Sequence, residues 1–229
     1  MKPSFYLYLI AVVVFIAGQE SHLFADRTAQ ILYFRAPKDA PKSAVIYQAS
    51  EAPFEAELKR NNFSKSFKLS DGDIVLHFLG SKLVEGEEFP VGAPSVSVPA
   101  AYEKVLILAF TDPQNPVLPV RFKVINANQG SFGEGDRMFI NFTDNKIAGA
   151  VGRKKLELGP FSVAVVKDAA GPKEEYSVSL DRLAPEQDKP VTFIRQNWRQ
   201  SANQRSLIFI FSPPGGSGVT YYNAPIRNL

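Results

Sequence analysis

The chain of 229 residues contains no cysteine. This absence excludes disulfide bonds, thiolate nucleophiles and cysteine-ligated metal sites together. It also excludes attachment to a membrane through a lipid-modified N-terminal cysteine. A chain of this length can build a hydrophobic core without disulfides, so the absence does not argue against a folded, secreted protein.

Histidine is almost as scarce, with two residues in the chain. His22 lies within the first 25 residues, an apolar N-terminal segment, which leaves His77 as the one histidine of residues 26–229. A zinc site needs three or four nitrogen, sulfur or oxygen ligands, and a Ser-His-Asp triad would have to use His77. No Gly-x-Ser-x-Gly motif is present to position a serine. We therefore predict no catalytic residue, no metal ligand and no cofactor, and expect His77 to be a partly buried, hydrogen-bonded residue of a strand.

Acidic and glycine-rich stretches give no stronger signal of chemistry. Asp71-Gly72-Asp73 is typical of a hairpin turn, and Glu85 to Glu88 form a solvated loop bounded by glycine and proline. The segments Gly130–Gly135 and Pro213–Gly218 lack the Gly-Lys-Ser/Thr ending of a phosphate-binding loop. A hydrolase that uses paired carboxylates is therefore the least favoured of three functional hypotheses.

Charge is nearly balanced, with 26 lysines and arginines against 23 acidic residues and a formal net charge of +3. A nucleic-acid-binding protein would show a dense basic stripe, and the one short basic run, Arg153-Lys154-Lys155, is typical of a solvated hairpin turn. We therefore predict that the protein does not bind nucleic acid.

The one long apolar run lies at the N-terminus. Lys2 is followed by the uncharged segment Phe5–Gly18, and a more polar stretch then ends at Ala25. This order is typical of a secretory signal peptide covering residues 1–25, with the mature protein beginning at about Asp26. The run is short for a permanent membrane span, which needs about 20 apolar residues. The alternatives are an uncleaved N-terminal anchor, which would then be the sole membrane attachment, or another cleavage site.

Beyond that segment, strand-like patterns dominate a chain that is 45% hydrophobic. Runs rich in valine, isoleucine, phenylalanine and tyrosine are separated by glycine, proline, asparagine and aspartate. The best helical candidate is Glu51–Arg60, but Pro53 limits it, and an edge strand over Phe54–Leu58 is the alternative. The other expected strands are 31–34, 44–47, 74–79, 105–110, 117–127, 138–142, 156–158, 161–166, 176–180, 191–195, 207–211 and 219–222.

Three strand patterns recur in the same order in both parts of the chain. Ile31–Phe34 matches Met138–Phe142, the pattern 67–78 matches 156–165, and Val105–Phe110 matches Ser206–Phe211. An internal repeat of this kind predicts two related units.

The repeat predicts an all-β fold with two consecutive immunoglobulin-like, antiparallel β-sandwich domains. We place them at residues 26–128 and 129–229, with the boundary in the polar, glycine-rich segment Asn126–Asp136. One larger jelly-roll-like sandwich is the alternative. The apolar runs 105–110 and 207–211 should be central strands covered on both faces, where the two domains could meet.

The most unusual segment is Phe193–Arg205, which contains the single tryptophan of the chain. An aromatic ring beside amide and guanidinium donors is what a sugar-binding or peptide-binding site can look like. The alternative is that the tryptophan fills the core while its polar neighbours face water. The candidate ligand-binding residues are Trp198, Arg195, Arg199, Gln196 and Asn197.

Several stretches resemble a group of uncharacterised exported bacterial proteins with two β halves. They are the strand Ile31–Pro37, the turn Asp112–Pro116, the strand Val120–Ala127, and the hairpins around Phe139–Phe142 and Lys154–Pro160. The resemblance implies a location in the bacterial cell envelope. That group has no established activity, so no functional residue carries over from it.

We therefore expect an exported, non-catalytic protein of the periplasm, the cell envelope or the extracellular space. Its partner would be an unidentified protein or an envelope component. The second hypothesis is a module that binds an envelope glycan, either another carbohydrate or peptidoglycan, through the Trp198 region.

Overall fold

A computed structural model of the chain describes residues 26–49, 51–169, 175–184, 189–199, 204–216 and 218–226. The predicted signal peptide, residues 1–25, lies outside the described residues. Every helix or strand assigned within these ranges is a strand, which confirms the all-β class. The two halves are both sandwich-like, each built from two four-stranded sheets.

The first half contains strands β1 to β8. Their bounds are β1 Thr28–Tyr33, β2 Ser43–Tyr47, β3 Phe54–Glu57, β4 Phe67–Lys68, β5 Ile74–Leu79, β6 Ser95–Val98, β7 Lys104–Thr111 and β8 Val120–Asn126. The second half contains β9 Arg137–Asn141, β10 Lys146–Val151, β11 Lys154–Leu158, β12 Val163–Val166, β13 Glu175–Leu183, β14 Val191–Arg199, β15 Arg205–Phe211 and β16 Thr220–Ile226.

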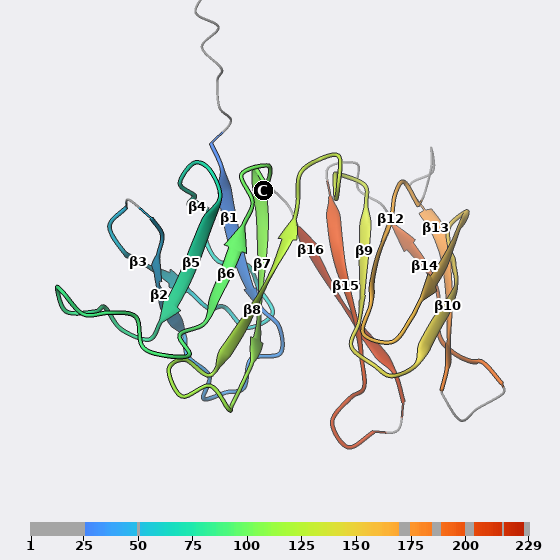
Figure 1. Cartoon of the computed structure of the whole chain (residues 1–229). Helices are drawn as coiled ribbons and strands as arrows, with labels where there is room; N and C mark the ends of the chain where they lie inside the picture. The colour runs from blue at the N-terminus through green and yellow to red at the C-terminus, as the bar shows by residue number, and fades with distance from the viewer. Residues whose placement is uncertain are drawn as a thin grey trace, which may run out of the picture.

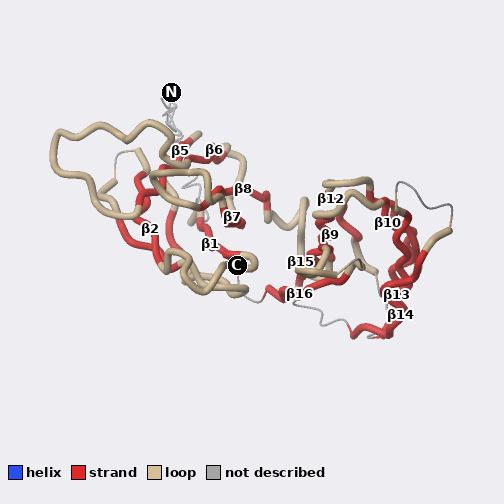
Figure 2. Tube along the Cα trace, turned by 90° about the horizontal axis from the view of Figure 1, so that it is seen from below, coloured by secondary structure: helices blue, strands red, loops and turns tan. Residues whose placement is uncertain are grey.

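The two halves have the same strand order. In the first half the sheets are β4-β1-β7-β8 and β3-β2-β5-β6, and in the second they are β12-β9-β15-β16 and β11-β10-β13-β14. We call the sheets that contain β1 and β9 the inner sheets, and the other two the outer sheets. The four sheets stack as outer, inner, inner and outer, with the halves side by side in Figure 1 and again in the perpendicular view of Figure 2.

The sheets are not purely antiparallel, which corrects one detail of the expectation. β1 pairs with β7 in parallel, and β9 pairs with β15 in the same way. Two parallel neighbouring strands need a long crossover connection. In each half, the chain between the two parallel strands forms the outer sheet before it returns to the inner sheet. The first and the seventh strand of each half therefore lie together at the centre of its inner sheet.

Two of the three matched patterns fall on strands at equivalent positions. Ile31–Phe34 and Met138–Phe142 lie on or next to β1 and β9, and the runs 105–110 and 206–211 lie on β7 and β15. The third match is wrong, because residues 74–78 belong to β5 of an outer sheet while 163–165 belong to β12 of an inner sheet. Short strand-turn-strand patterns resemble one another, so strands at different positions of the fold can be matched by mistake.

The apolar runs lie where they were expected, in central strands covered on both faces. Leu106 and Leu108 of β7 and Leu207 and Phe209 of β15 are fully buried in a shared core between the inner sheets. Alternate residues of the same strands, Ile107 and Ile208 among them, point into the sandwich of their own half. Burial on both faces explains why these strands show no alternation with polar residues.

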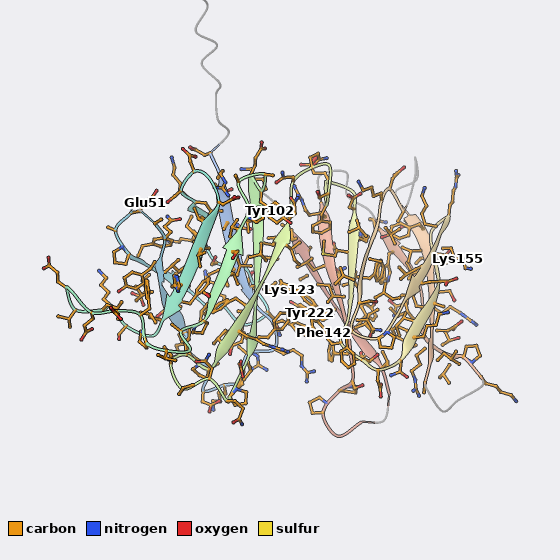
Figure 3. All side chains as sticks on the ribbon, viewed as in Figure 1. Glu51, Tyr102, Lys123, Phe142, Lys155 and Tyr222 are labelled. Carbon is orange, nitrogen blue, oxygen red and sulfur yellow. The ribbon has the colours of Figure 1, made fainter. Side chains whose placement is uncertain are left out.

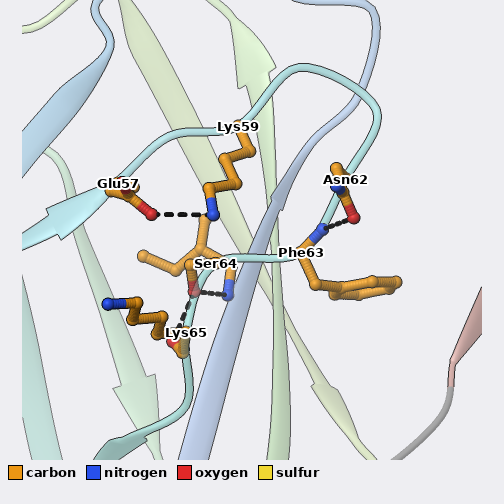
Figure 4. A network of polar contacts seen from close by, with 7 residues as sticks. Glu57, Lys59, Asn62, Phe63, Ser64 and Lys65 are labelled. Atoms are coloured by element: carbon orange, nitrogen blue, oxygen red, sulfur yellow. Dashed lines mark hydrogen bonds and ion pairs between the residues drawn. The ribbon is translucent and has the colours of Figure 1, made fainter.

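The helical candidate Glu51–Arg60 is corrected to the alternative, an edge strand. β3 pairs with β2 at the edge of the outer sheet, and Pro53 directly precedes it. After β3 the chain turns back onto β1, where the Ser64 hydroxyl accepts a hydrogen bond from the Ile31 N–H at 2.9 Å. Figure 4 shows this turn, with the nearby ion pair between Glu57 and Lys59 at 2.9 Å.

The chain passes from β8 to β9 through residues 127–136, and the predicted boundary at 128/129 lies in this connection. Arg205 of β15 donates from Nη1 to the carbonyls of Ala127 and Phe132, both at 2.5 Å. The Asn128 amide instead contacts the first half, accepting from the N–H groups of Glu103 and Lys104 at 3.0 Å. The connection is therefore held from both sides.

Candidate functional site

The five residues predicted from the tryptophan segment do not share one surface. They lie on β14, an edge strand of the second outer sheet. Successive side chains of a strand point to opposite faces, so Trp198 and Gln196 point one way, while Arg195, Asn197 and Arg199 point the other. The structure thus separates the aromatic ring from both guanidinium groups.

Trp198 is half-buried against the core of the second half. Its ring lies 5.6 Å from that of Tyr221, 6.3 Å from that of Phe139 and 6.4 Å from that of Tyr176, measured between centroids. The ring therefore packs where the edge strand β14 of the outer sheet meets the edge strand β16 of the inner sheet. This arrangement is close to the alternative in which the tryptophan fills the core.

Two of the four polar candidates near Trp198, Gln196 and Arg199, have partners within the chain. The Gln196 side-chain oxygen accepts from the Tyr221 hydroxyl at 2.7 Å and from the Trp198 indole N–H at 3.4 Å. On the other face, Arg199 pairs with Glu175 at 2.8 Å. A ligand role for this segment stays a prediction.

A different site lies at one edge of the interface between the inner sheets. It is an open groove of about 390 Å³, lined by β7, β8, β9, β12 and the turn before β12. We call it the groove. Its lining residues are Phe110, Arg121, Phe122, Lys123, Ile140, Asn141, Phe142, Phe161 and Val163. Figure 3 shows Lys123 and Phe142 between the two halves.

Aromatic rings line much of the groove. Phe110 and Phe142 approach edge to face, with centroids 5.3 Å apart. Phe161 is 72% exposed and Val163 is 41% exposed, so apolar surface on this side faces water. An exposed apolar surface bordered by polar groups is a feature of interaction sites.

Phe161 has an unusual backbone as well as an exposed ring. Its φ is 50°, in the left-handed region that bulky residues avoid. Its N–H donates to the Thr143 carbonyl at 3.2 Å, which helps to hold this conformation. A strained backbone that displays an aromatic ring is more typical of a binding residue than of a scaffold residue.

Two cations stand on β8 at the rim of the groove. Arg121 and Lys123 are two residues apart, so both point to the same face as Ile125, which is buried between the inner sheets. The Arg121 guanidinium lies 5.8 Å from the centre of the Phe110 ring. No acidic side chain of the described residues pairs with either cation. The groove therefore combines apolar walls with uncompensated positive charge.

The opposite edge of the same interface is closed. The Tyr222 hydroxyl donates to the Asn61 carbonyl at 2.8 Å across the two halves. Beside it, the Arg35 guanidinium lies 4.4 Å from the centre of the Phe211 ring. One edge is thus fastened by polar and cation–π contacts, and the other is left open as the groove.

Several ionisable groups outside the groove have shifted pKa values. The shifts that stand out belong to residues elsewhere: Lys59 lowers the pKa of Glu57, Lys155 lowers that of Glu157, and burial raises the pKa of Tyr33. In the described part of the chain, no three histidine, cysteine or acidic side chains gather in a way that could hold a metal ion. The groove presents apolar surface together with positive charge.

A second exposed feature is the connection between β5 and β6, residues 80–94, which we call the acidic loop. It carries the predicted Glu85 to Glu88 cluster and borders a shallow hollow of about 630 Å³ on the first outer sheet. His77 lies beneath it and stacks on Phe89, with centroids 4.2 Å apart. The expectation of a hydrogen-bonded His77 is corrected at Nδ1, which is buried without a hydrogen-bond partner among the described residues.

Sequence reasoning missed the groove because its residues come from distant segments. Arg121 and Lys123 lie in the expected strand 117–127, and their spacing placed them on one face. Phe161 follows a Gly-Pro pair, so it looked like the first residue of a strand. Nothing in the local patterns indicated that β8 and β12 line the same opening.

No family model matches the chain, and no curated protein matches it. Among solved structures, it is similar to a DUF3823 family protein from Bacteroides ovatus ATCC 8483, at 13% identity and a TM-score of 0.21. That match covers 74% of this chain and 97% of the other.

Within the described residues, no helix has the length and apolar character needed to cross a membrane.

Proposed function

We propose that this is an exported, non-catalytic binding protein of the bacterial periplasm or cell envelope. Its partner is an envelope protein or another envelope component, and the groove between the inner sheets is the binding site. The export part of the proposal rests on the signal-like segment of residues 1–25, and the binding part rests on the groove.

One observation carries the binding proposal: exposed aromatic surface and two unpaired cations occur together in the groove. Interaction sites are enriched in aromatic residues and arginine, which supply large contact area and directed hydrogen bonds. A volume of about 390 Å³ accommodates a few side chains or one small group rather than a large cofactor. The best ligand is therefore a segment with apolar groups and a nearby negative charge.

Site-specific photocrosslinking tests the proposal in envelope fractions of the host. Benzoylphenylalanine replaces Val163 in the groove, which leaves both cations in place, and replaces Val191 in a matched control. Each valine is 41% exposed and lies on an edge strand, but Val191 is on the second outer sheet. We expect adducts from position 163 and far fewer from position 191. Equal yields at the two positions would contradict a specific groove.

A second variant separates binding from folding. Phe161→Asn removes the exposed ring but suits the left-handed backbone, because asparagine tolerates positive φ better than phenylalanine does. We expect this variant to keep its thermal stability and to lose adducts at position 163. Unchanged adduct formation by Phe161→Asn would show that the groove does not make the contact.

A glycan-binding module remains the second candidate, supported by the exposed part of the Trp198 ring beside Gln196 and the Tyr221 hydroxyl. Aromatic rings beside polar groups are suited to sugar recognition. Binding to peptidoglycan fragments that is lost in Trp198→Ala, which removes the ring, would support it. Glycan binding that persists in that variant would exclude this site.

A further inference from the structure

The acidic loop is the most prominent projection of the first half. It extends from the first outer sheet, on the side away from the second half, in both Figure 1 and Figure 2. In this loop, Val91 is 98% exposed and Val84 is 69% exposed. Glu85, Glu87 and Glu88 lie between these valines in the sequence, and the loop carries one lysine, Lys82. The loop thus presents apolar side chains within a negatively charged segment.

Several contacts hold the acidic loop in one conformation. The Val84 N–H donates to the Glu87 carboxylate at 2.9 Å, and the Glu87 N–H donates back to the Val84 carbonyl at 3.0 Å. The Leu83 N–H donates to the Tyr47 hydroxyl at 2.6 Å. Near its other end, Asn115 donates to the Gly92 carbonyl at 2.9 Å. A loop ordered before binding loses less conformational entropy when it docks.

The acidic loop and the groove are complementary. The groove offers exposed Phe161 and Val163 beside two cations without acidic partners. The loop offers exposed valines beside glutamates, of which Glu85 and Glu88 make no ion pair among the described residues. Complementary charge steers association and fixes its register, while the apolar contact supplies most of the driving force.

The loop of one molecule does not lie at its own groove. The part of the loop that carries the glutamates projects from the first half on the side away from the second half, as both views show, whereas the groove is lined by strands of both inner sheets. Only a second copy can bring the two features together.

We propose that the occupant of the groove is the acidic loop of a second copy of this chain. The inference rests on the proposed function of the groove as a binding site, and names its partner. Loop and groove are different surfaces, so the contact is head-to-tail. Each bound copy still has a free loop or a free groove, and such heterologous contacts extend into chains or close into rings.

Charge exchange tests this contact. The groove variant carries Arg121→Glu and Lys123→Glu, and the loop variant carries Glu85→Lys and Glu88→Lys. All four side chains are exposed, so both variants should fold like the wild type, which circular dichroism checks. We expect the wild-type mass in sedimentation equilibrium to rise with concentration. Each variant alone should lose this association by about tenfold or more in affinity, because like charges then face each other.

Mixing the two variants provides the decisive measurement. In the mixture every groove again meets a loop of opposite charge, so association should return, as it should in a chain that carries all four changes. A wild type that stays at the mass of one chain at every concentration overturns the inference. So does a mixture that fails to associate when the wild type does.

Photocrosslinking at position 163 separates this inference from the proposed function. An adduct of twice the chain mass, with the crosslink mapped to residues 80–94, supports both. An adduct with another envelope component, and none with a second copy, overturns the self-contact and leaves the proposed function in place. The absence of any adduct overturns both.

Discussion

The ring of Phe34 in the first half stacks on the ring of Phe209 in the second, with centroids 4.1 Å apart and planes 15° from parallel. Phe209 is fully buried and Phe34 nearly so. Phe142 of the second half also lies close to Phe34, at 5.7 Å between centroids. The two halves thus share a core whose aromatic rings come from both.

Truncating Phe34 should destabilise the second half as well as the first. Phe34→Ala should cost about 3–5 kcal/mol in unfolding free energy, the usual range for a buried phenylalanine. Trp198, the single tryptophan, reports on the second half, so its emission during urea unfolding should shift to lower denaturant in this variant. Val84→Ala, on the exposed acidic loop, is the control and should change stability by less than about 0.5 kcal/mol. An unshifted tryptophan transition in Phe34→Ala would show that the halves unfold independently.

Two glycines with similar backbone conformations should respond differently to alanine. Gly152 has a φ of 60° in the turn between β10 and β11, and a Cβ there would lie 1.9 Å from the Ala169 carbonyl oxygen. Gly72 has a φ of 79° and open space around its Cβ position. Gly72→Ala should cost about 1–2 kcal/mol of backbone strain, and Gly152→Ala about 1–3 kcal/mol beyond that. Thermal unfolding measures both, and equal losses would contradict the close approach.

Lys155 should control the acid titration of Glu157. Their side chains lie 2.6 Å apart, and this contact lowers the pKa of Glu157 below its ordinary value, with a smaller contribution from Lys146. A lowered carboxyl pKa in the folded state stabilises the protein above the unfolded-state pKa, and this contribution is lost as the pH falls through the folded pKa. Lys155→Met should therefore raise the pKa of Glu157, read from its side-chain NMR shift.

Lys59→Met provides the matched comparison for that titration. It should raise the pKa of Glu57, which Lys59 lowers through a 2.9 Å contact, and leave Glu157 unchanged. Parallel changes at both glutamates in either variant would argue against local pairing.

The mature N-terminus should retain Arg27. Its guanidinium donates to the carbonyls of Gly72 at 2.7 Å, Pro99 at 2.9 Å and Tyr102 at 3.1 Å, and also to that of Ser70. These bonds tie the residue that precedes β1 to the connection between β4 and β5 and to the connection between β6 and β7. Intact-mass spectrometry of the exported protein should therefore place the first residue at about Asp26. A chain that begins after Arg27 would contradict this cleavage.

The strands were largely predictable because most of them are rich in β-branched and aromatic residues. Ile74–Leu79 was predicted with the bounds that β5 has, and β7 and β15 were recognised as doubly covered from their continuous apolar runs. β10 was missed, because Gly149 and two alanines weaken its pattern. The structure gives the reason for that glycine, since a Cβ there would lie 2.1 Å from the Ser179 carbonyl oxygen of the paired strand.

The candidate site was far less predictable than the strands. Trp198 was selected because tryptophan is rare in this chain. On β14, however, its ring points to one face of the sheet, and Arg195 and Arg199 point to the other. Arg121 and Phe161 are unremarkable in their local sequence, and they come together only because the inner sheets pack face to face. Local patterns report which face a side chain takes, but they do not report which distant strand faces it.

The shared core has a consequence for the order in which the chain folds. A first half made alone would display Leu32, Phe34, Leu106 and Leu108 to water until the second half covers them. An exposed apolar sheet face of this kind associates readily with other chains. The nascent protein therefore passes through a stage in which its most aggregation-prone surface is uncovered, and that stage ends only when β15, close to the C-terminus, is in place.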